Sequence, residues 1–312
     1  MRTWAAVSLI VAVWCTPSAA LAECTRSLGG VEAPTAVILS GGGAKGAYEA
    51  GVVAVLAERR ASLRIAAGSS AGALSAAMLV AGRTDRLETM WRSIRRDQVY
   101  SIRAPIFFAG LLPGWLTLLA VNGSSSLLDP QPLRDLISTS LDLERVRSSP
   151  VRLLVTATDL VRKETRAFDN QTVTVDALMA AAAVPGAFPA VEVDGAILVD
   201  GGLTSRAPVI EALRATTVSR ALVVVSYASG EPTAPPTTMR SALDAAVETA
   251  MLHQIRRDVE LARLTHPGVD VQMLAPSAPL RVRPLEFEPE GLARLVDLGR
   301  ADAIDCLRVW GD

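Results

Sequence analysis

Short apolar runs alternate along the chain with longer segments of helical length. The runs most typical of strands buried on both faces are 36–40, 64–68, 151–158, 221–227 and 269–274. Segment 46–60 after the first run has helical length and a polar end, and the almost wholly apolar segment 72–81 after the second predicts a buried helix. This alternation predicts a three-layer α/β/α fold with a mostly parallel central sheet.

The pattern changes in the second half of the chain. Valines and other apolar residues flank Asp194-Gly195 within 191–199, which predicts a β-hairpin whose two-residue turn has positive φ angles. Residues 229–238 are rich in Pro, Thr and Gly and predict a loop, and residues 241–264 predict one long amphipathic helix.

The first 22 residues have the pattern of a secretory signal peptide. Arg2 supplies the positive charge, residues 4–14 form an apolar run too short to span a bilayer, and residues 20–22 fit a small-x-small cleavage site. We therefore expect an exported protein that begins at Glu23. Residues 21–24 also resemble a lipobox, so a lipid anchor on Cys24 is an alternative to simple export.

Length and composition favour one globular domain. The chain has 312 residues, of which 50% are hydrophobic and 20% are charged. We expect residues 23–312 to form this domain, with a motif-bearing core at about 33–210 and a C-terminal part, 211–312, that completes it.

The charged and metal-binding residue types exclude other classes of protein. Thirty-one Lys+Arg against 32 Asp+Glu give a net charge of −1, which lacks the basic excess that nucleic-acid binding requires. Two histidines, His253 and His266, and cysteines without zinc-ligand spacing give little basis for a metal site. After export, Cys24 and Cys306 would remain and could form a disulfide.

The first candidate motif is the glycine-rich segment 41–46, which lies between a predicted strand and a predicted helix. Its backbone amides, together with the positive end of the helix, could hold a negative charge. The same letters fit the dinucleotide pattern G-x-G-x-x-G, so a nucleotide-dependent oxidoreductase is an alternative. That alternative expects an acidic residue at the end of the next strand, where this chain has Ser69 and Ser70.

The second motif, Gly68-Ser69-Ser70-Ala71-Gly72, fits the G-x-S-x-G nucleophile elbow at a strand-to-helix turn. The glycines on either side let strand and helix crowd together while the turn exposes the Ser70 hydroxyl. A serine hydroxyl needs a base. The third motif, Asp200-Gly201-Gly202, ends the second strand of the predicted hairpin and offers the Asp200 carboxylate for that role.

The order of these motifs, with an Ala-rich block ending in Pro-Gly-Ala-Phe-Pro at 180–189 before the last one, resembles the patatin-like phospholipase family over residues 33–210. The resemblance implies an α/β/α fold, hydrolysis of lipid acyl esters by a serine–aspartate dyad, and no metal or cofactor. The substrate would be a lipid or another acyl ester, and no protein partner is inferred. A binding protein with an inactive site is a further alternative.

Carried over by position, the resemblance makes Ser70 the nucleophile, Asp200 the base, and Gly41, Gly42 and Gly43 the oxyanion loop. The residues that support these motifs would be Lys45, Gly46, Gly68, Gly72, Gly201 and Gly202. Two residues depart from the family pattern: Ala181 replaces a common serine, and Arg206 occupies a position where asparagine is frequent.

Another hydrolase mechanism fits the same chain order. Ser70, Asp200 and His266 follow one another as in the Ser–Asp/Glu–His triad of α/β-hydrolases. Against this alternative, His266 precedes the predicted strand 269–274 and therefore lies at the wrong end of a strand to reach Ser70.

The segment 106–121 is apolar and is broken by Gly110, Pro113 and Gly114. It could be a kinked core helix, or an interfacial segment beside the site with Trp115 at a lipid–water boundary. We expect it to form a wall of the acyl-chain groove and to contact a membrane surface peripherally.

Overall fold

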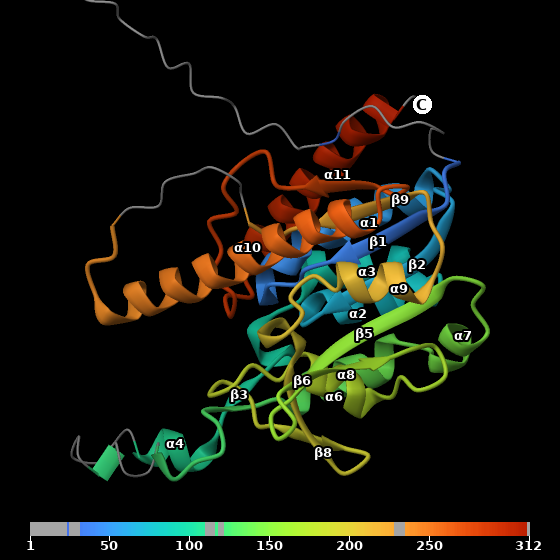
Figure 1. Cartoon of the computed structure of the whole chain (residues 1–312). Coiled ribbons are helices and arrows are strands. Elements are labelled where there is room, and N and C mark those ends of the chain that lie inside the picture. Colours follow the sequence, from blue (N-terminus) through green and yellow to red (C-terminus); the bar gives the residue numbers. More distant parts are fainter. Residues whose placement is uncertain (1–23, 25–31, 110–115, 118–121, 228–234, 311–312) are drawn as a thin grey trace, which may run out of the picture.

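A computed structural model describes residues 24, 32–109, 116–117, 122–227 and 235–310 of the chain. The predicted signal peptide, residues 1–22, lies outside the described residues. Within the described part, the strands form one 8-stranded sheet and a small two-stranded one (Figure 1).

The large sheet is mostly parallel, as the alternating pattern predicts. Its strands are β1 (Thr35–Leu39), β2 (Leu63–Ser69), β5 (Arg152–Asp159), β6 (Glu164–Phe168), β7 (Val191–Val193), β8 (Ala196–Asp200), β9 (Arg220–Val224) and β10 (Asp270–Leu274). Strands β10, β9, β1, β2 and β5 run parallel in that order, and β8 and β7 continue the sheet in antiparallel pairing. Strand β6 pairs antiparallel with β5. The small sheet pairs β3 (Ser101–Ile102) with β4 (Leu128–Asp129).

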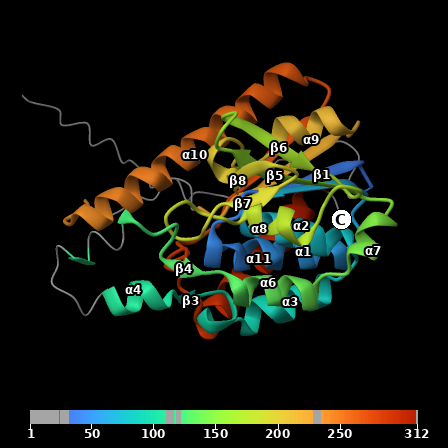
Figure 2. The same cartoon turned by 90° about the horizontal axis from the view of Figure 1, so that it is seen from below.

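Helices cover both faces of the large sheet, so the fold has three layers (Figure 2). One face carries α9 (Val209–Ala215) and the long α10 (Met239–Thr265). The other face carries α1 (Gly46–Glu58), α2 (Ala71–Val80), α3 (Thr84–Ser93), α6 (Gln131–Ser140), α7 (Leu143–Arg147), α8 (Val175–Ala181) and α11 (Pro289–Trp310). A short helix, α4 (Ala104–Ala109), projects from the body.

Two separate apolar cores explain why the strands are continuously apolar. Ala36 and Ile38 of β1 pack into the core beneath α9 and α10, while Val37 and Leu39 pack into the core beneath α1, α2 and α11. All five residues of β1 are buried. A strand that buries both faces is nearly continuously apolar, which is the pattern that 36–39 shows.

The predicted hairpin is present as β7 and β8. Asp194 and Gly195 have φ angles of 50° and 73°, the positive values that a type I′ turn requires. Most of the predicted loop 229–238 lies outside the described residues, and the helix expected at 241–264 spans Met239–Thr265.

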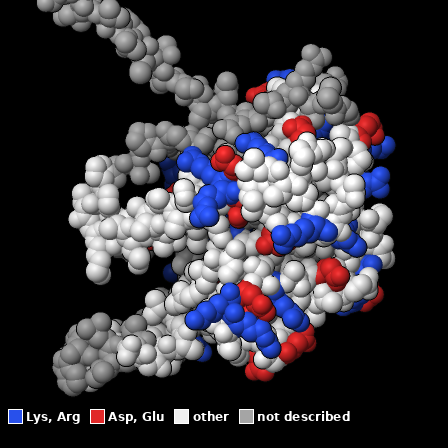
Figure 3. Space-filling model, in the orientation of Figure 1, with Lys and Arg blue, Asp and Glu red and all other residues white. Residues whose placement is uncertain are grey.

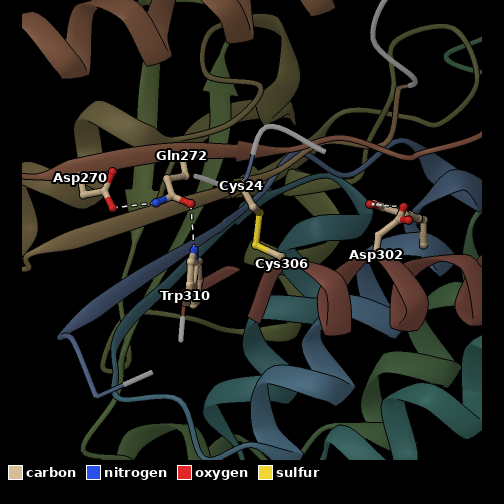
Figure 4. Close-up of a disulfide and its surroundings, with 7 residues drawn as sticks. Cys24, Asp270, Gln272, Asp302, Cys306 and Trp310 are labelled. Atoms are coloured by element: carbon tan, nitrogen blue, oxygen red, sulfur yellow. Dashed lines mark hydrogen bonds between the residues drawn. A yellow bond between two sulfur atoms is a disulfide. The ribbon is translucent and has the colours of Figure 1, made fainter. Parts of the chain in front are cut away.

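Helix α11, which the sequence analysis does not identify, closes the structure against α1. Two glycines make this close contact possible: Gly299 lies against the Tyr48 carbonyl, and Gly51 lies against the Val296 carbonyl. The Cys24–Cys306 disulfide joins α11 to the segment ahead of β1, with 5.3 Å between the two Cα atoms (Figure 4). The structure thus contains the disulfide that the sequence allows.

Candidate active site

Ser70 lies in the sharp turn between β2 and α2, in a strained backbone conformation with φ 56° and ψ −133°. Glycines on both sides make the turn possible. A Cβ on Gly68 would overlap the Gly72 backbone, and a Cβ on Gly72 would lie 2.6 Å from the Leu39 carbonyl oxygen. The Ser70 N–H donates to the Ala181 carbonyl at 3.1 Å, which ties the elbow to the end of α8.

Strand β5 brings Asp200 to Ser70. On one edge of β5, Ser69 pairs with Thr156 and Asp200 pairs with Ala157, the next residue. The parallel strand β2 and the antiparallel strand β8 therefore meet end to end. Gly201 fits between them because a Cβ there would overlap the Thr156 carbonyl and lie 2.9 Å from Ser69 Oγ.

The Asp200 carboxylate is fully buried, and its two oxygens differ. Oδ1 accepts the Gly202 N–H at 2.7 Å, while Oδ2 has no fully formed hydrogen bond to any residue that the structure describes. Burial raises the pKa of Asp200 above its ordinary value, and Arg206, the Ser70 hydroxyl and the Gly202 N–H each lower it in part. Oδ2 is therefore the oxygen left to take a proton from Ser70.

The glycine-rich turn has an acidic partner that the sequence analysis does not identify. The Gly41 N–H donates to Glu49 Oε1 at 2.8 Å. By contrast, no described residue accepts a hydrogen bond from the N–H of Gly42 or of Gly43, and both glycines line the same cavity as Ser70. Gly43 packs on Pro284, whose carbonyl accepts the Ala44 N–H at 2.8 Å.

Glu49 lies in α1 and is completely buried. Its Oε1 also accepts the hydroxyls of Ser40 and Ser226, both at 3.0 Å. Burial raises the pKa of Glu49 to about 7, against the lowering effects of Ser40, Ser226, Arg206 and Gly41. The signal in the sequence is one acidic residue among the apolar residues of 46–57.

Arg206, which departs from the family pattern, is buried beside two carboxylates. Its Nη2 donates to the Tyr227 hydroxyl at 2.9 Å, and its Nε has no hydrogen-bond partner in the described chain. Burial alone would lower the pKa of Arg206, but Tyr227, Asp200 and Glu49 raise it overall. The guanidinium thus stays charged and acts on both acids.

Lys45 also lies over the Tyr227 ring, with Nζ 4.7 Å from the ring centroid. It also forms an ion pair with Glu248 of α10, with 3.1 Å between Nζ and Oε1. This ion pair joins the glycine-rich turn to α10, which lies on the face of the sheet opposite to the one that carries α1 and α2.

A cavity of about 550 Å³ opens onto Ser70. Its polar lining residues include Lys45 and Arg206, which both lie over the Tyr227 ring. Most of the other lining side chains are apolar and come from α3, α6, α8, α10 and residues 282–287, with Trp91 and Phe287 stacked at 6.5 Å between ring centroids. Its size and its mixed lining are typical of a ligand site.

The segment 106–121 does not form a wall of this cavity in its described part, so that prediction is wrong there. Ile106 lines a different hollow, with Arg103 and Asp129, and Phe107 and Phe108 are 58% and 63% exposed. The apolar walls of the cavity come instead from α3, α6, α8, α10 and residues 282–287. Residues 110–115 and 118–121, including Trp115, lie outside the described residues.

The structure also contradicts the histidine triad. His266 ends α10 just before β10 begins, whereas Ser70 follows the end of β2. Strand β10 runs in the same direction as β9, β1 and β2. His266 therefore lies near the amino-terminal ends of these strands and Ser70 lies at their carboxyl-terminal ends, separated by the length of a strand, about 16 Å. Exposed His253 does not line the cavity either.

The dinucleotide alternative lacks its acidic residue in the structure as well. Strand β2 ends at Ser69, and the next residue is the Ser70 elbow. Among the described residues, no group of three His, Cys, Asp or Glu could hold a metal ion, and no helix combines the length and apolar character needed to cross a membrane.

Residues 37–213 match the family model described as patatin-like phospholipase. NTE family proteins of Mycobacterium tuberculosis and Mycobacterium bovis are 30% identical to this chain over 174 residues. That match covers 55% of this chain but only 44% of the length of those relatives.

The comparison with solved structures found two further bacterial proteins. VipD from Legionella pneumophila has 14% sequence identity and a TM-score of 0.48, covering 89% of this chain and 67% of its own. ExoU in complex with SpcU, from the type III secretion system of Pseudomonas aeruginosa, has 18% identity and a TM-score of 0.40, covering 91% of this chain and 54% of its own.

Proposed function

The chain belongs to the patatin-like phospholipase family, and from this premise we propose that it is a serine acyl hydrolase that cleaves carboxylic esters of lipids through a Ser70–Asp200 dyad. One observation carries the proposal. The strained serine elbow adjoins the buried Asp200 carboxylate and opens onto a mostly apolar cavity whose lining also includes charged side chains. An ester with a long acyl chain needs both parts of such a site.

In the proposed reaction, Ser70 Oγ attacks the ester carbonyl carbon while its proton passes to Asp200 Oδ2. The carbonyl oxygen becomes an oxyanion, which the N–H groups of Gly42 and Gly43 stabilise. Gly41 is left out of this role because its N–H already donates to Glu49. The intermediate collapses to an acyl-serine as the leaving alcohol takes the proton from Asp200. Water, activated by the same carboxylate, then releases the fatty acid.

The environment of Asp200 suits a base of this kind. An ordinary aspartate is a poor acceptor for a serine proton, and burial raises its pKa. Arg206 limits this effect by favouring the ionised form, which is the form that accepts the serine proton. The oxyanion donors are expected to contribute about 10²–10³-fold each to the rate.

We also propose that the protein is exported and works at a lipid surface. The Cys24–Cys306 disulfide supports export, since disulfides persist in oxidising compartments. It also favours simple export over a lipid anchor, because a lipid on Cys24 would need the same sulfur. N-terminal sequencing of the protein from its own host tests this: Glu23 as first residue is expected, and Met1 would contradict export.

Exposed apolar side chains support the surface contact. Phe107 and Phe108 on α4, and Met239, Leu243 and Val247 on α10, are exposed. The two helices project on the same side of the body, and the amino-terminal part of α10 presents few charged side chains on the face shown (Figure 3). Replacing Phe107 and Phe108 by serine should reduce sedimentation with vesicles but leave hydrolysis of a soluble ester unchanged.

The test of the hydrolase proposal is labelling with a fluorophosphonate, combined with lipid profiling. The probe should attach to Ser70, and the wild-type protein should release fatty acid from a panel of phospholipids, lysophospholipids and glycerides. Ser70→Ala should lose both activities while remaining folded. Release of fatty acid by Ser70→Ala at the wild-type rate would contradict the proposal.

A further inference from the structure

The glycine-rich turn must be held in place, since an oxyanion site works only when its donors are oriented before the reaction. Gly41, Gly42 and Gly43 all have positive φ angles, of 68°, 139° and 59°. Such a run has little intrinsic preference for one conformation. Contacts from outside the turn therefore decide where its N–H groups point.

Glu49 supplies those contacts at one end of the turn. Its Oε1 is the common acceptor for three donors: the Gly41 N–H at 2.8 Å and the hydroxyls of Ser40 and Ser226 at 3.0 Å each. Ser40 also accepts the Ser226 N–H at 3.2 Å. One carboxylate oxygen thus joins the ends of β1 and β9, which are neighbours in the sheet.

The effect of Glu49 extends to Gly42 through Ser226. The Cβ of Ser226 lies 3.2 Å from the place where a Cβ on Gly42 would be, so the serine packs directly against that glycine. The hydrogen bond from Ser226 to Glu49 fixes this side chain. Gly43, at the other end, is fixed by Pro284.

We propose that Glu49 is the positioning residue of the oxyanion loop: it turns the Gly41 N–H away from the substrate, holds Gly42 through Ser226, and leaves the N–H groups of Gly42 and Gly43 for the oxyanion. Glu49 does not touch the substrate. The inference rests on the proposed hydrolase function and adds to it the residue on which the geometry of the loop depends.

The role requires an acceptor oxygen more than a negative charge. Glu49 Oε2 is buried and has no hydrogen-bond partner in the described chain, so only Oε1 organises the loop. Three ionisable groups interact electrostatically with Glu49. Arg206 lowers the pKa of Glu49, and Glu49 in turn raises the pKa values of Tyr227 and Tyr48. A glutamine would keep the acceptor and remove the charge, which makes it the conservative variant.

The test compares Glu49→Ala and Glu49→Gln with the wild type, using kcat and KM for a soluble p-nitrophenyl ester. Glu49→Ala should lower kcat by about 10²–10³-fold, the effect of losing one oxyanion donor, with KM within about threefold. Glu49→Gln should restore kcat to within about tenfold of the wild type. A merely structural role would not give this separation of kcat from KM or this rescue.

Asp302 provides a matched control. It is also a buried carboxylate, and it binds the Tyr48 hydroxyl at 3.0 Å and the Ser277 hydroxyl at 2.6 Å, away from the cavity. Asp302→Ala should destabilise the protein but keep kcat within about threefold. A loss of kcat in Asp302→Ala as large as that in Glu49→Ala would overturn the inference.

Ser226→Ala keeps the test decisive if Glu49→Ala does not fold. It removes one of the three donors but keeps the Cβ against Gly42, so kcat should fall on the order of 2–10-fold. Full activity in Ser226→Ala, or in a folded Glu49→Ala, would overturn the inference while the hydrolase proposal stands. A wild-type protein that neither hydrolyses the ester nor reacts with the fluorophosphonate at Ser70 would overturn both.

Discussion

Ser69 and Asp200 are neighbours along one edge of β5, where they pair with the consecutive residues Thr156 and Ala157. This relationship places the proposed nucleophile next to the proposed base, although β2 and β8 each pair with β5 and not with one another. Ser70 immediately follows Ser69, and Asp200 is the last residue of β8. The geometry of the dyad therefore depends on the register of two strands with β5, one parallel and one antiparallel.

Asp200→Asn should lower kcat by a factor on the order of 10²–10⁴, the usual contribution of a positioned base. The substitution keeps the size of the side chain and removes the charge that accepts the serine proton. KM should change little, because Asp200 lies behind Ser70 and is buried. Steady-state kinetics with a soluble ester measures both constants.

The matched control for this prediction is His266→Ala. It should keep wild-type kcat because His266 lies at the amino-terminal ends of the parallel strands, opposite to the ends that Ser70 follows. If His266→Ala abolished turnover in a folded protein, a histidine would be the base and the dyad would be wrong.

Arg206→Met should move the acidic limb of the kcat/KM profile to higher pH. Asp200 must be ionised to act as the base, so activity is lost as pH falls through its pKa. Burial places that pKa above the ordinary 3.8, and Arg206 holds it down. Loss of the neighbouring positive charge should raise it further. Arg206→Lys, which keeps the charge, should leave the limb near its wild-type position, and an unmoved limb in Arg206→Met would show that Arg206 does not act on the base.

Glu49 should make the folded protein less stable as pH rises from about 4.5 to about 7. Burial raises the pKa of Glu49 from 4.5 to about 7, so the folded protein binds this proton more tightly than the unfolded chain. The stabilising contribution is complete below pH 4.5 and is lost as pH rises through the folded pKa. At about 1.4 kcal/mol per unit, the loss is on the order of 3 kcal/mol.

Urea unfolding of the wild type and of Glu49→Gln at a series of pH values measures this effect. Glutamine cannot titrate, so the free energy of unfolding of the variant should rise relative to the wild type over that range. Two curves that run parallel from pH 4.5 to pH 7 would mean that Glu49 does not titrate there.

Gly299→Ala should destabilise the protein by about 1–3 kcal/mol. The added Cβ would overlap the Tyr48 carbonyl and force α11 away from α1. Gly268→Ala is the control, since a Cβ there would meet no atom within 4 Å. Thermal and urea unfolding of both variants should show a loss for Gly299→Ala alone, and an equal loss in both would contradict a packing role for Gly299.

The sequence contains enough information to predict the serine elbow and the carboxylate beside it because each is encoded locally. A strand buried on both faces must be continuously apolar, and the turn after it needs glycines around Ser70, so the pattern of β2 and α2 predicts the site. Asp200 is distinguishable from Asp194 because only Asp194 lies in the two-residue turn. The family match over residues 37–213 confirms the recognition that these motifs support.

The walls and the inner charges of the site could not be predicted because they depend on contacts between distant segments. Glu49, Arg206 and Ser226 come from three segments that are distant in sequence, and no local pattern indicates that they surround one turn. The same holds for Pro284 and Phe287, which reach the cavity from a region without regular structure. The apolar character of segment 106–121 predicts a wall of the cavity, but its described phenylalanines, Phe107 and Phe108, face solvent.

The disulfide between Cys24 and Cys306 turns almost the whole chain into a covalent ring that includes every residue of the proposed site. A protease that cuts once at an exposed turn, such as Asp194-Gly195, would open this ring without releasing a fragment. The two pieces would stay attached through the sulfur atoms and through the sheet. The nicked protein would run as one species on a gel until a reductant separated it into two.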